Sequence, residues 1–167
     1  MSDTRARIYR YIESHPGVHF RELTRALDLA TGQVQYHLAR LDRITSESVN
    51  GRTHYYTASF GPWERHAIAF LRRETARDIL VTLIGRGAAR PSEVTDHLDI
   101  ARSTLEHHLD GLVKYDIVEK RRDKGRVTLA LCRPDLTVEL LAAVDPTVPD
   151  RLSDRFTRLL DQLFESG

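Results

Sequence analysis

Apolar residues recur at spacings of three and four in several short stretches of the chain, which is the pattern of helices that bury one face. In the first part of the chain this pattern predicts three helices, over about residues 5–14, 21–27 and 31–43. The helical spacing then stops, and Asn50-Gly51 inside residues 46–57 is a strong signal for a two-residue hairpin turn. We therefore expect three helices followed by a β-hairpin.

The same order of elements returns in the second half of the chain. Helices are expected over about residues 75–85, 91–98 and 102–115, and Pro91 suits the first turn of its helix. Residues 117–131 have the pattern of a strand, a charged turn and an alternating strand. Helix, helix, turn, helix and hairpin is the order of a winged helix-turn-helix domain, and it occurs twice.

An internal repeat supports this interpretation. A shift of 71 residues lays Thr4–Ile44 over Thr75–Tyr115 without a gap, with ten identical positions. Gly51 matches Gly125 at a spacing of 74, so we expect the second wing to be longer by three residues. The identical pairs are Thr4/Thr75, Ile8/Ile79, Glu22/Glu93, Thr24/Thr95, Leu27/Leu98, Asp28/Asp99, Ala30/Ala101, His37/His108, Leu38/Leu109 and Leu41/Leu112.

The expected fold class is mainly α with small β-wings (α+β), made of two tandem winged helix-turn-helix domains plus C-terminal helices. Residues 62–71 read as a helix that couples the domains, because a flexible linker would be richer in Gly and Ser. Helices are also expected over 136–144 and from about Arg151. The predicted divisions are residues 1–60 (domain 1), 61–73 (linker helix), 74–132 (domain 2) and 133–167 (C-terminal helices).

The last predicted helix has an apolar stripe of Leu152, Phe156, Leu159 and Leu163. It forms a dimer seam or packs against its own domain. We favour a homodimer, because helix-turn-helix proteins usually pair to read two half-sites. The tandem copies weaken this argument, since a monomer already has two reading helices.

Charge is balanced over the whole chain but not along it. The net charge is +1, from 25 basic and 24 acidic residues, so no global positive field indicates nucleic acid. Residues 1–60 and 61–73 each carry +2, residues 74–132 are neutral and residues 133–167 carry −3. The C-terminal segment is therefore the part least suited to contact phosphate.

Several kinds of site are not expected. Cys132 is the single cysteine, so an intrachain disulfide and a thiolate metal cluster are excluded, and no basic cluster lowers the pKa of its thiol. No apolar run reaches membrane-spanning length and no signal segment opens the chain, so we expect a cytoplasmic protein with no membrane partner. No phosphate loop, nucleophile elbow or paired carboxylates appear, so we expect no enzyme activity and no cofactor.

The histidines favour a structural interpretation. His37 and His108 each precede a core Leu, and we expect each to hydrogen-bond the backbone. His107 and His108 point about 100° apart on a helix and are poorly placed to share a metal. His15 and His19 flank a turn and would need two further ligands for zinc. No metal site is predicted.

The outward face of each third helix has the residue types that read a major groove. In the first copy Gln35 suits adenine, and Arg40 suits guanine or a phosphate. In the second copy Glu106 and Asp110 repel phosphate, unless Glu106 accepts from cytosine. A solvated helix face is the alternative, and the repeated helix-turn-helix context favours DNA.

The second wing is the most basic segment, with five cations and Asp123 as its one acid, whereas the first wing offers Arg52 and His54. We expect the first domain mainly to read bases and the second to grip the DNA backbone. The candidate DNA-binding residues are Thr31, Gln33, Gln35, Tyr36, Arg40, Arg43, Arg52, Arg102, Ser103, Thr104, His107, Lys114, Lys120, Arg121, Arg122, Lys124 and Arg126.

These third helices resemble a known family. The stretches Gln35-Tyr36-His37-Leu38-Ala39-Arg40-Leu41 and Ser103-Thr104-Leu105-Glu106-His107-His108-Leu109-Asp110-Gly111-Leu112 look like the recognition-helix signature of ArsR-type, MarR-like winged-helix regulators. Residues 16–23 resemble the entry to the second helix in archaeal regulators with two such domains. The resemblance covers about residues 4–131 and implies binding of double-stranded DNA.

The chain departs from that family at two points. Ala30 and Ala101 stand where the family often has a capping Ser, so the third helices must be capped in another way or weakly. The paired cysteines of metal-sensing members are missing, so no metal response is implied. No effector is predicted.

The function expected from the sequence is that of a DNA-binding transcription regulator. The alternative is a protein-interaction winged-helix module of a basal transcription or chromosome-organisation complex. That alternative predicts wings and third helices without basic residues, which the second wing contradicts.

Overall fold

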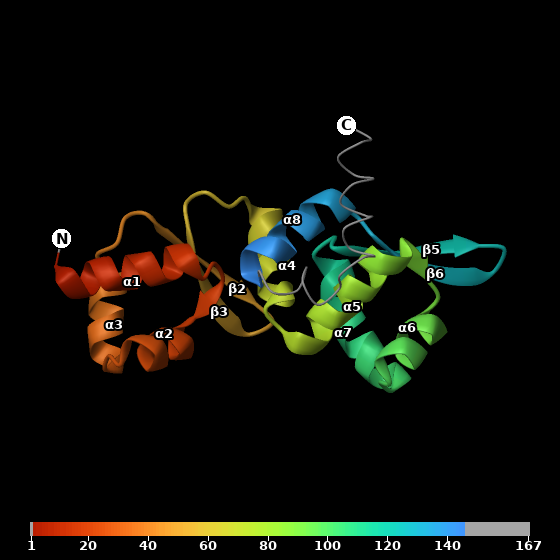
Figure 1. Ribbon diagram of the computed structural model, residues 1–167, viewed down its shortest axis with the longest axis horizontal. Helices are drawn as coiled ribbons and strands as arrows, with labels where there is room; N and C mark the ends of the chain where they lie inside the picture. Colours follow the sequence, from red (N-terminus) through yellow and green to blue (C-terminus); the bar gives the residue numbers. More distant parts are fainter. Residues whose placement is uncertain (1, 146–167) are drawn as a thin grey trace. The chain divides into compact units, whose positions relative to one another are not determined.

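The computed structural model describes residues 2–145 and confirms the expected fold class (Figure 1). The chain divides into two compact units, the first ending at Ala69 and the second beginning at Phe70. This division falls inside helix α4 (Pro62–Leu71). None of the helices among the described residues combines the length and apolar character needed to cross a membrane.

Unit 1 is a three-helix cluster with a three-stranded antiparallel sheet in the order β1-β3-β2. Its core is formed by buried aliphatic residues of all three helices, among them Ile8, Ile12, Leu23 and Val34, each 0% exposed. Each such side chain contributes about 1.5–3 kcal/mol through its burial. The elements are α1 (Asp3–Ser14), β1 (Val18–His19), α2 (Phe20–Leu27), α3 (Thr31–Leu38), β2 (Ile44–Val49), β3 (Arg52–Thr57) and the first part of α4.

Unit 2 has the same plan, with a sheet in the order β4-β6-β5. Ile79, Leu80 and Leu83 of α5 and Leu105 and Leu109 of α7 are 0% exposed and form its core. In Figure 1 the hairpin of β5 and β6 projects beyond the helices of its own unit. The elements are α5 (Glu74–Arg86), β4 (Ala88–Ala89), α6 (Pro91–Leu98), α7 (Arg102–Lys114), β5 (Val118–Asp123), β6 (Arg126–Leu131) and α8 (Pro134–Val144).

The repeat found in the sequence is reproduced in backbone geometry. The helix before each third helix ends at an aspartate in the left-handed region, with φ 52° and ψ 52° at Asp28 and φ 53° and ψ 51° at Asp99. Asn50 and Gly51 turn the first hairpin with φ of 48° and 78°, and Lys124 and Gly125 turn the second with 49° and 78°. Positive φ at both central residues is the type I′ turn that Asn-Gly predicts.

A strand that the sequence analysis did not predict completes each sheet. Val18 of β1 pairs with Tyr55, and Ala89 of β4 pairs with Leu129. These two-residue strands are too short to show an alternating pattern, so periodicity could not reveal them. They place the start of α2 and of α6 beside the wing of the same unit.

The prediction of a longer second wing was wrong. All four wing strands have six residues, and the three additional residues lie before the second wing. The expected helix over residues 31–43 was also too long, because α3 ends at Leu38. There the amides of Arg40 and Leu41 donate to carbonyls three residues earlier, which tightens the chain into a 3₁₀ turn. In unit 2, α7 continues to Lys114.

The C-terminal predictions fall partly outside the structure. The helix expected over residues 136–144 is α8, which begins at Pro134. The helix expected from Arg151 lies outside the described residues, as do the proposed dimer residues Leu152, Phe156, Leu159 and Leu163.

Candidate nucleic-acid interface

Helix α3 presents the outward face that its sequence predicts. Val34 is fully buried against unit 1, whereas Gln35, Tyr36, Ala39 and Arg40 are exposed. The candidates Thr31, Gln33 and Arg43 are exposed as well. The segment therefore offers solvent one amide, one aromatic ring and one guanidinium from a single face, with no acid among them.

The start of α3 is capped from within the helix. Ala30 has no side-chain acceptor, and its backbone N–H donates instead to Oε1 of Gln33 at 3.2 Å. This is the reverse half of a capping box, in which the third helical residue reaches back to the residue before the helix. Gln33 therefore has a structural role, and its amide NH₂ group is the part left for another ligand.

Helix α7 repeats this arrangement with different side chains. Leu105, Leu109 and Leu112 are fully buried, and the candidates Arg102, Ser103, His107 and Lys114 are exposed. Thr104 is half-buried and lies at the edge of this face. Unlike α3, the helix has no side-chain cap.

Glu106 is held by two cations and does not face solvent as an unpaired acid. Its carboxylate accepts from Nε of Arg102 and from Nζ of Lys120, each at 3.1 Å. The hydrogen bond from Lys120 lowers the pKa of Glu106; burial opposes this shift, and Arg102 adds to it. The expectation that Glu106 simply repels phosphate is therefore incomplete, because the carboxylate joins α7 to β5.

The second wing carries the expected cations, but they are not equivalent. Lys120 is paired with Glu106, and Nε of Arg121 donates to Oε1 of Glu119 at 2.6 Å. Within residues 2–145, Arg122, Lys124 and Arg126 have no acidic partner within 4.0 Å, and all three are exposed. Alternation along β5 places Arg121 and Arg122 on opposite faces of the hairpin.

The first wing offers less than the sequence suggested. Arg52 is exposed beside the turn, but His54 is 2% exposed. Nδ1 of His54 donates to the carbonyl oxygen of Gly17 at 2.7 Å, which fastens β3 to the segment before β1. His54 is therefore a structural residue and is not available to DNA.

Two arginines of α2 were passed over in the sequence analysis. Arg21 and Arg25 are exposed, are four residues apart and so share one face of the helix. The repeat itself carried the signal, because the equivalent positions of the second copy are Ser92 and Asp96. A change of charge at matched positions indicates that the two copies differ in use.

The other tempting residues do not form a site. Among residues 2–145 no cluster of three potential metal ligands occurs. Nδ1 of His37 is buried without a hydrogen-bond partner in that part of the chain, so the expected backbone bond of this atom is not formed. Burial, followed by Glu119 and Asp116, raises the pKa of the Cys132 thiol, so this cysteine is not activated.

Comparisons with known proteins agree with the duplicated fold. A family model described as an N-terminal HTH domain matches residues 2–68, and one described as a helix-turn-helix domain matches residues 71–121. An uncharacterised HTH-type transcriptional regulator of Methanocaldococcus jannaschii is 28% identical over 130 residues, which cover 76% of this chain. The matched region spans 33% of the length of that relative.

Among solved structures, HlyU from Vibrio cholerae is similar over 55% of this chain and 91% of its own, with a TM-score of 0.44 and 19% identity. The two domain models meet at the junction between the units and each contains one helix-turn-helix. The chain therefore carries two helix-turn-helix domains in tandem, over residues 2–68 and 71–121.

Proposed function

We propose that this protein is a DNA-binding transcription regulator that places α3 and α7 in major grooves of duplex DNA. The observation that carries the proposal is the outward face of α3, where Gln35, Tyr36 and Arg40 are exposed together and no acid interrupts them. Amide and guanidinium groups on a helix of this width are the groups that read base edges. The HTH-type regulator of Methanocaldococcus jannaschii supports the same class of function.

The two domains divide the work. Unit 1 reads bases through Gln35 and Arg40. Unit 2 has Asp110 exposed on its third helix, which disfavours close approach to phosphate there, but its wing carries Arg122, Lys124 and Arg126 without acidic partners among the described residues. Such a cluster suits contact with backbone or minor groove. Base reading is therefore concentrated in unit 1.

The proposal includes no catalytic step and no cofactor, and it places the protein in the cytoplasm with the DNA. Association of two copies through Leu152, Phe156, Leu159 and Leu163 remains a prediction from the sequence. Light scattering coupled to gel filtration tests it, comparing the natural chain with Leu159→Asp. A monomeric mass for both would contradict the homodimer.

Selection of duplexes from a random library, followed by fluorescence anisotropy, tests the function. The natural protein should enrich a defined sequence, and its affinity should fall steeply with salt because bound phosphates release counterions. Gln35→Ala should change the enriched sequence, with a cost of about 1–3 kcal/mol at one base pair. If the natural protein binds no duplex at 50 mM salt, the proposal is wrong and the protein-interaction alternative gains support.

A further inference from the structure

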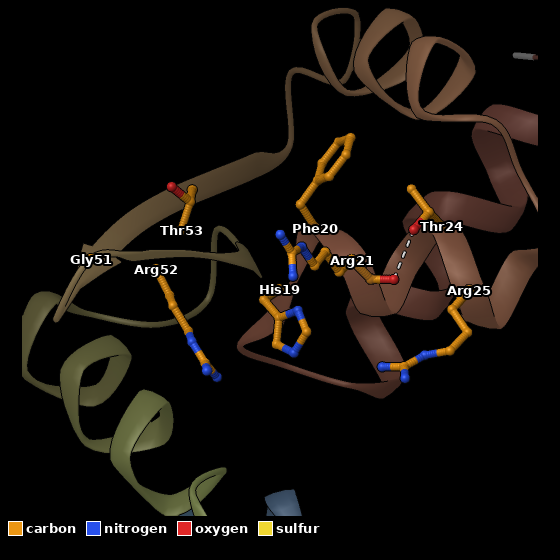
Figure 2. Close-up of a pocket in the computed structure, with 8 residues that line it drawn as sticks. All are labelled: His19, Phe20, Arg21, Thr24, Arg25, Gly51, Arg52 and Thr53. Carbon is orange, nitrogen blue, oxygen red and sulfur yellow. Dashed lines mark hydrogen bonds between the residues drawn. The ribbon is translucent and has the colours of Figure 1, made fainter.

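Unit 1 has an open groove of about 870 Å³ between α2 and the first wing. We call it the α2–wing groove. Figure 2 shows Arg21 and Arg25 reaching from α2, and Arg52 from the wing, toward the space between these elements. The groove is lined by His19, Phe20, Arg21, Thr24, Arg25, Gly51, Arg52 and Thr53, so no acid takes part.

The three arginines of the groove hold their charges free. Within residues 2–145 none of Arg21, Arg25 and Arg52 has a carboxylate within 4.0 Å or a side-chain hydrogen bond. All three are exposed, so they remain hydrated and their mutual repulsion is tolerated in water. A set of unpaired guanidiniums from two elements around one space is suited to phosphate, which each can bind through two parallel hydrogen bonds.

Unit 2 contains the same groove with the opposite chemistry. Its smaller counterpart of about 320 Å³ lies between α6 and the second wing and is lined by Ala88, Ala89, Arg90, Glu93, Asp123, Arg126 and Thr128. Here Nε of Arg90 pairs with Oε1 of Glu93 at 2.8 Å, and Nη1 of Arg86 lies 3.5 Å from Oε2. Two acids thus offset the cations that line this second groove.

One side chain explains why the shared glutamate behaves differently. Glu22 and Glu93 occupy equivalent positions, but Glu22 does not line its groove. Oε1 of Glu22 accepts from the hydroxyl of Tyr11 at 3.3 Å. The residue equivalent to Tyr11 is Thr82, whose hydroxyl donates to the carbonyl of Asp78 in its own helix. Glu93 therefore stays in its groove and holds Arg90.

We propose that the α2–wing groove of unit 1 binds the phosphodiester backbone of duplex DNA, and that the matching groove of unit 2 does not. A polymer strand fits better than a small molecule, because small-molecule sites enclose most of their ligand and are mainly apolar, whereas this lining is largely exposed and cationic. The proposal rests on the proposed function and adds a backbone contact to the domain that reads bases.

The salt dependence of binding tests this inference in the full-length chain. Anisotropy with a 30-base-pair duplex gives the slope of log affinity against log salt. The variant R21A/R25A/R52A should reduce that slope by about 0.9 for each arginine removed, as expected for lost phosphate contacts. The variant R21K/R25K/R52K should keep the slope, because it retains the charges. Circular dichroism and thermal unfolding check that both variants are folded.

Matched changes compare the two grooves. R25A and R90A each remove one arginine that lines a groove, and R25A alone should lower the slope by about 0.9. S92R/D96R installs the charges of α2 on α6 and should raise the slope. An equal effect of R25A and R90A, or no effect of S92R/D96R, would overturn the proposal.

Two further outcomes separate the inference from the function on which it rests. If the natural protein binds duplex DNA and R21A/R25A/R52A has the same slope, the groove proposal is wrong and the regulator proposal stands. If the natural protein binds no duplex at 50 mM salt, both are wrong. Calorimetric titration with adenosine triphosphate covers a soluble ligand: binding that the triple alanine variant loses, with an unchanged DNA slope, assigns the groove to nucleotides and overturns the DNA assignment.

Discussion

The guanidinium carbon of Arg40 lies 3.6 Å from the centroid of the Tyr36 ring, and Nη1 of the same group donates to the carbonyl oxygen of Tyr36 at 2.9 Å. Both residues are exposed on α3, and Tyr36 is 52% exposed despite its large apolar ring. The ring thus holds the guanidinium in one orientation on the outward face. An oriented Arg loses less conformational entropy when it binds a base or a phosphate.

Removal of this ring should weaken DNA binding through Arg40. An exposed cation–π contact contributes about 0.5–1 kcal/mol, so Tyr36→Ala should reduce affinity about two- to fivefold. Tyr36→Phe keeps the ring and should bind like the natural protein. Anisotropy with the selected duplex measures both. A loss with Phe equal to that with Ala would show that the hydroxyl matters and the ring does not.

The pairing of Glu106 with Arg102 and Lys120 leads to a second prediction. Glu106→Gln removes the charge that holds both cations, so they become available to phosphate. Affinity for unrelated duplexes should rise, and the salt slope should steepen by about one to two contacts. Glu139→Gln removes the same charge from an exposed position of α8 and serves as the control. Equal slopes for Glu106→Gln and the natural protein would show that the pair does not limit DNA binding.

The sequence predicted the parts of the fold that depend on long periodic patterns and turn chemistry. The burial of Leu105, Leu109 and Leu112 follows from helical spacing, and the turn at Asn50-Gly51 follows from the need for positive φ at two successive residues. The end of α3 could not be predicted, because the helical spacing continues through Leu41 while the backbone tightens into a 3₁₀ turn.

The candidate site was predicted less well, because pairing between side chains depends on tertiary structure. Lys120 and Glu106 are fourteen residues apart, and no sequence pattern indicates that they meet. His54 looked like a wing residue because it follows the turn, but its hydrogen bond to Gly17 depends on strand β1, which periodicity does not reveal. Arg21 and Arg25 were overlooked because each copy was analysed for its third helix and not for differences between the copies.

The two adjacent arginines of the second wing should differ in their effects on binding. Arg122 has no acidic partner among the described residues, whereas Arg121 is paired with Glu119 and lies on the other face of β5. Arg122→Ala should lower affinity for every duplex similarly and reduce the salt slope by about 0.9, and Arg121→Ala should do less. Each variant serves as the control for the other in salt titrations on two unrelated duplexes. A larger effect of Arg121→Ala would contradict the assignment of the paired face.

Glu47 joins the first wing to α4 and makes the stability of unit 1 dependent on pH. Its carboxylate accepts from Nε of Arg65 at 3.1 Å and lies 2.9 Å from Nε2 of His66. Burial acts to raise the pKa of Glu47, but the hydrogen bonds and charges of His66 and Arg65 outweigh it and lower the pKa below 4.5. A lowered folded-state pKa means that the stabilisation is present above 4.5 and is lost as the pH falls through the folded value.

Glu47→Gln should therefore lower the free energy of unfolding of unit 1 by about 1–2 kcal/mol at pH 6, a typical value for charged hydrogen bonds. The difference between this variant and the natural protein should shrink as the pH falls from 6 to 3, because the natural carboxylate becomes protonated. Urea unfolding followed by the fluorescence of Trp63, which lies in α4, reports on this contact. Glu13→Gln, at an exposed position of α1, is the control. A difference between Glu47→Gln and the natural protein that stays constant across this pH range would show that the carboxylate charge does not stabilise the junction.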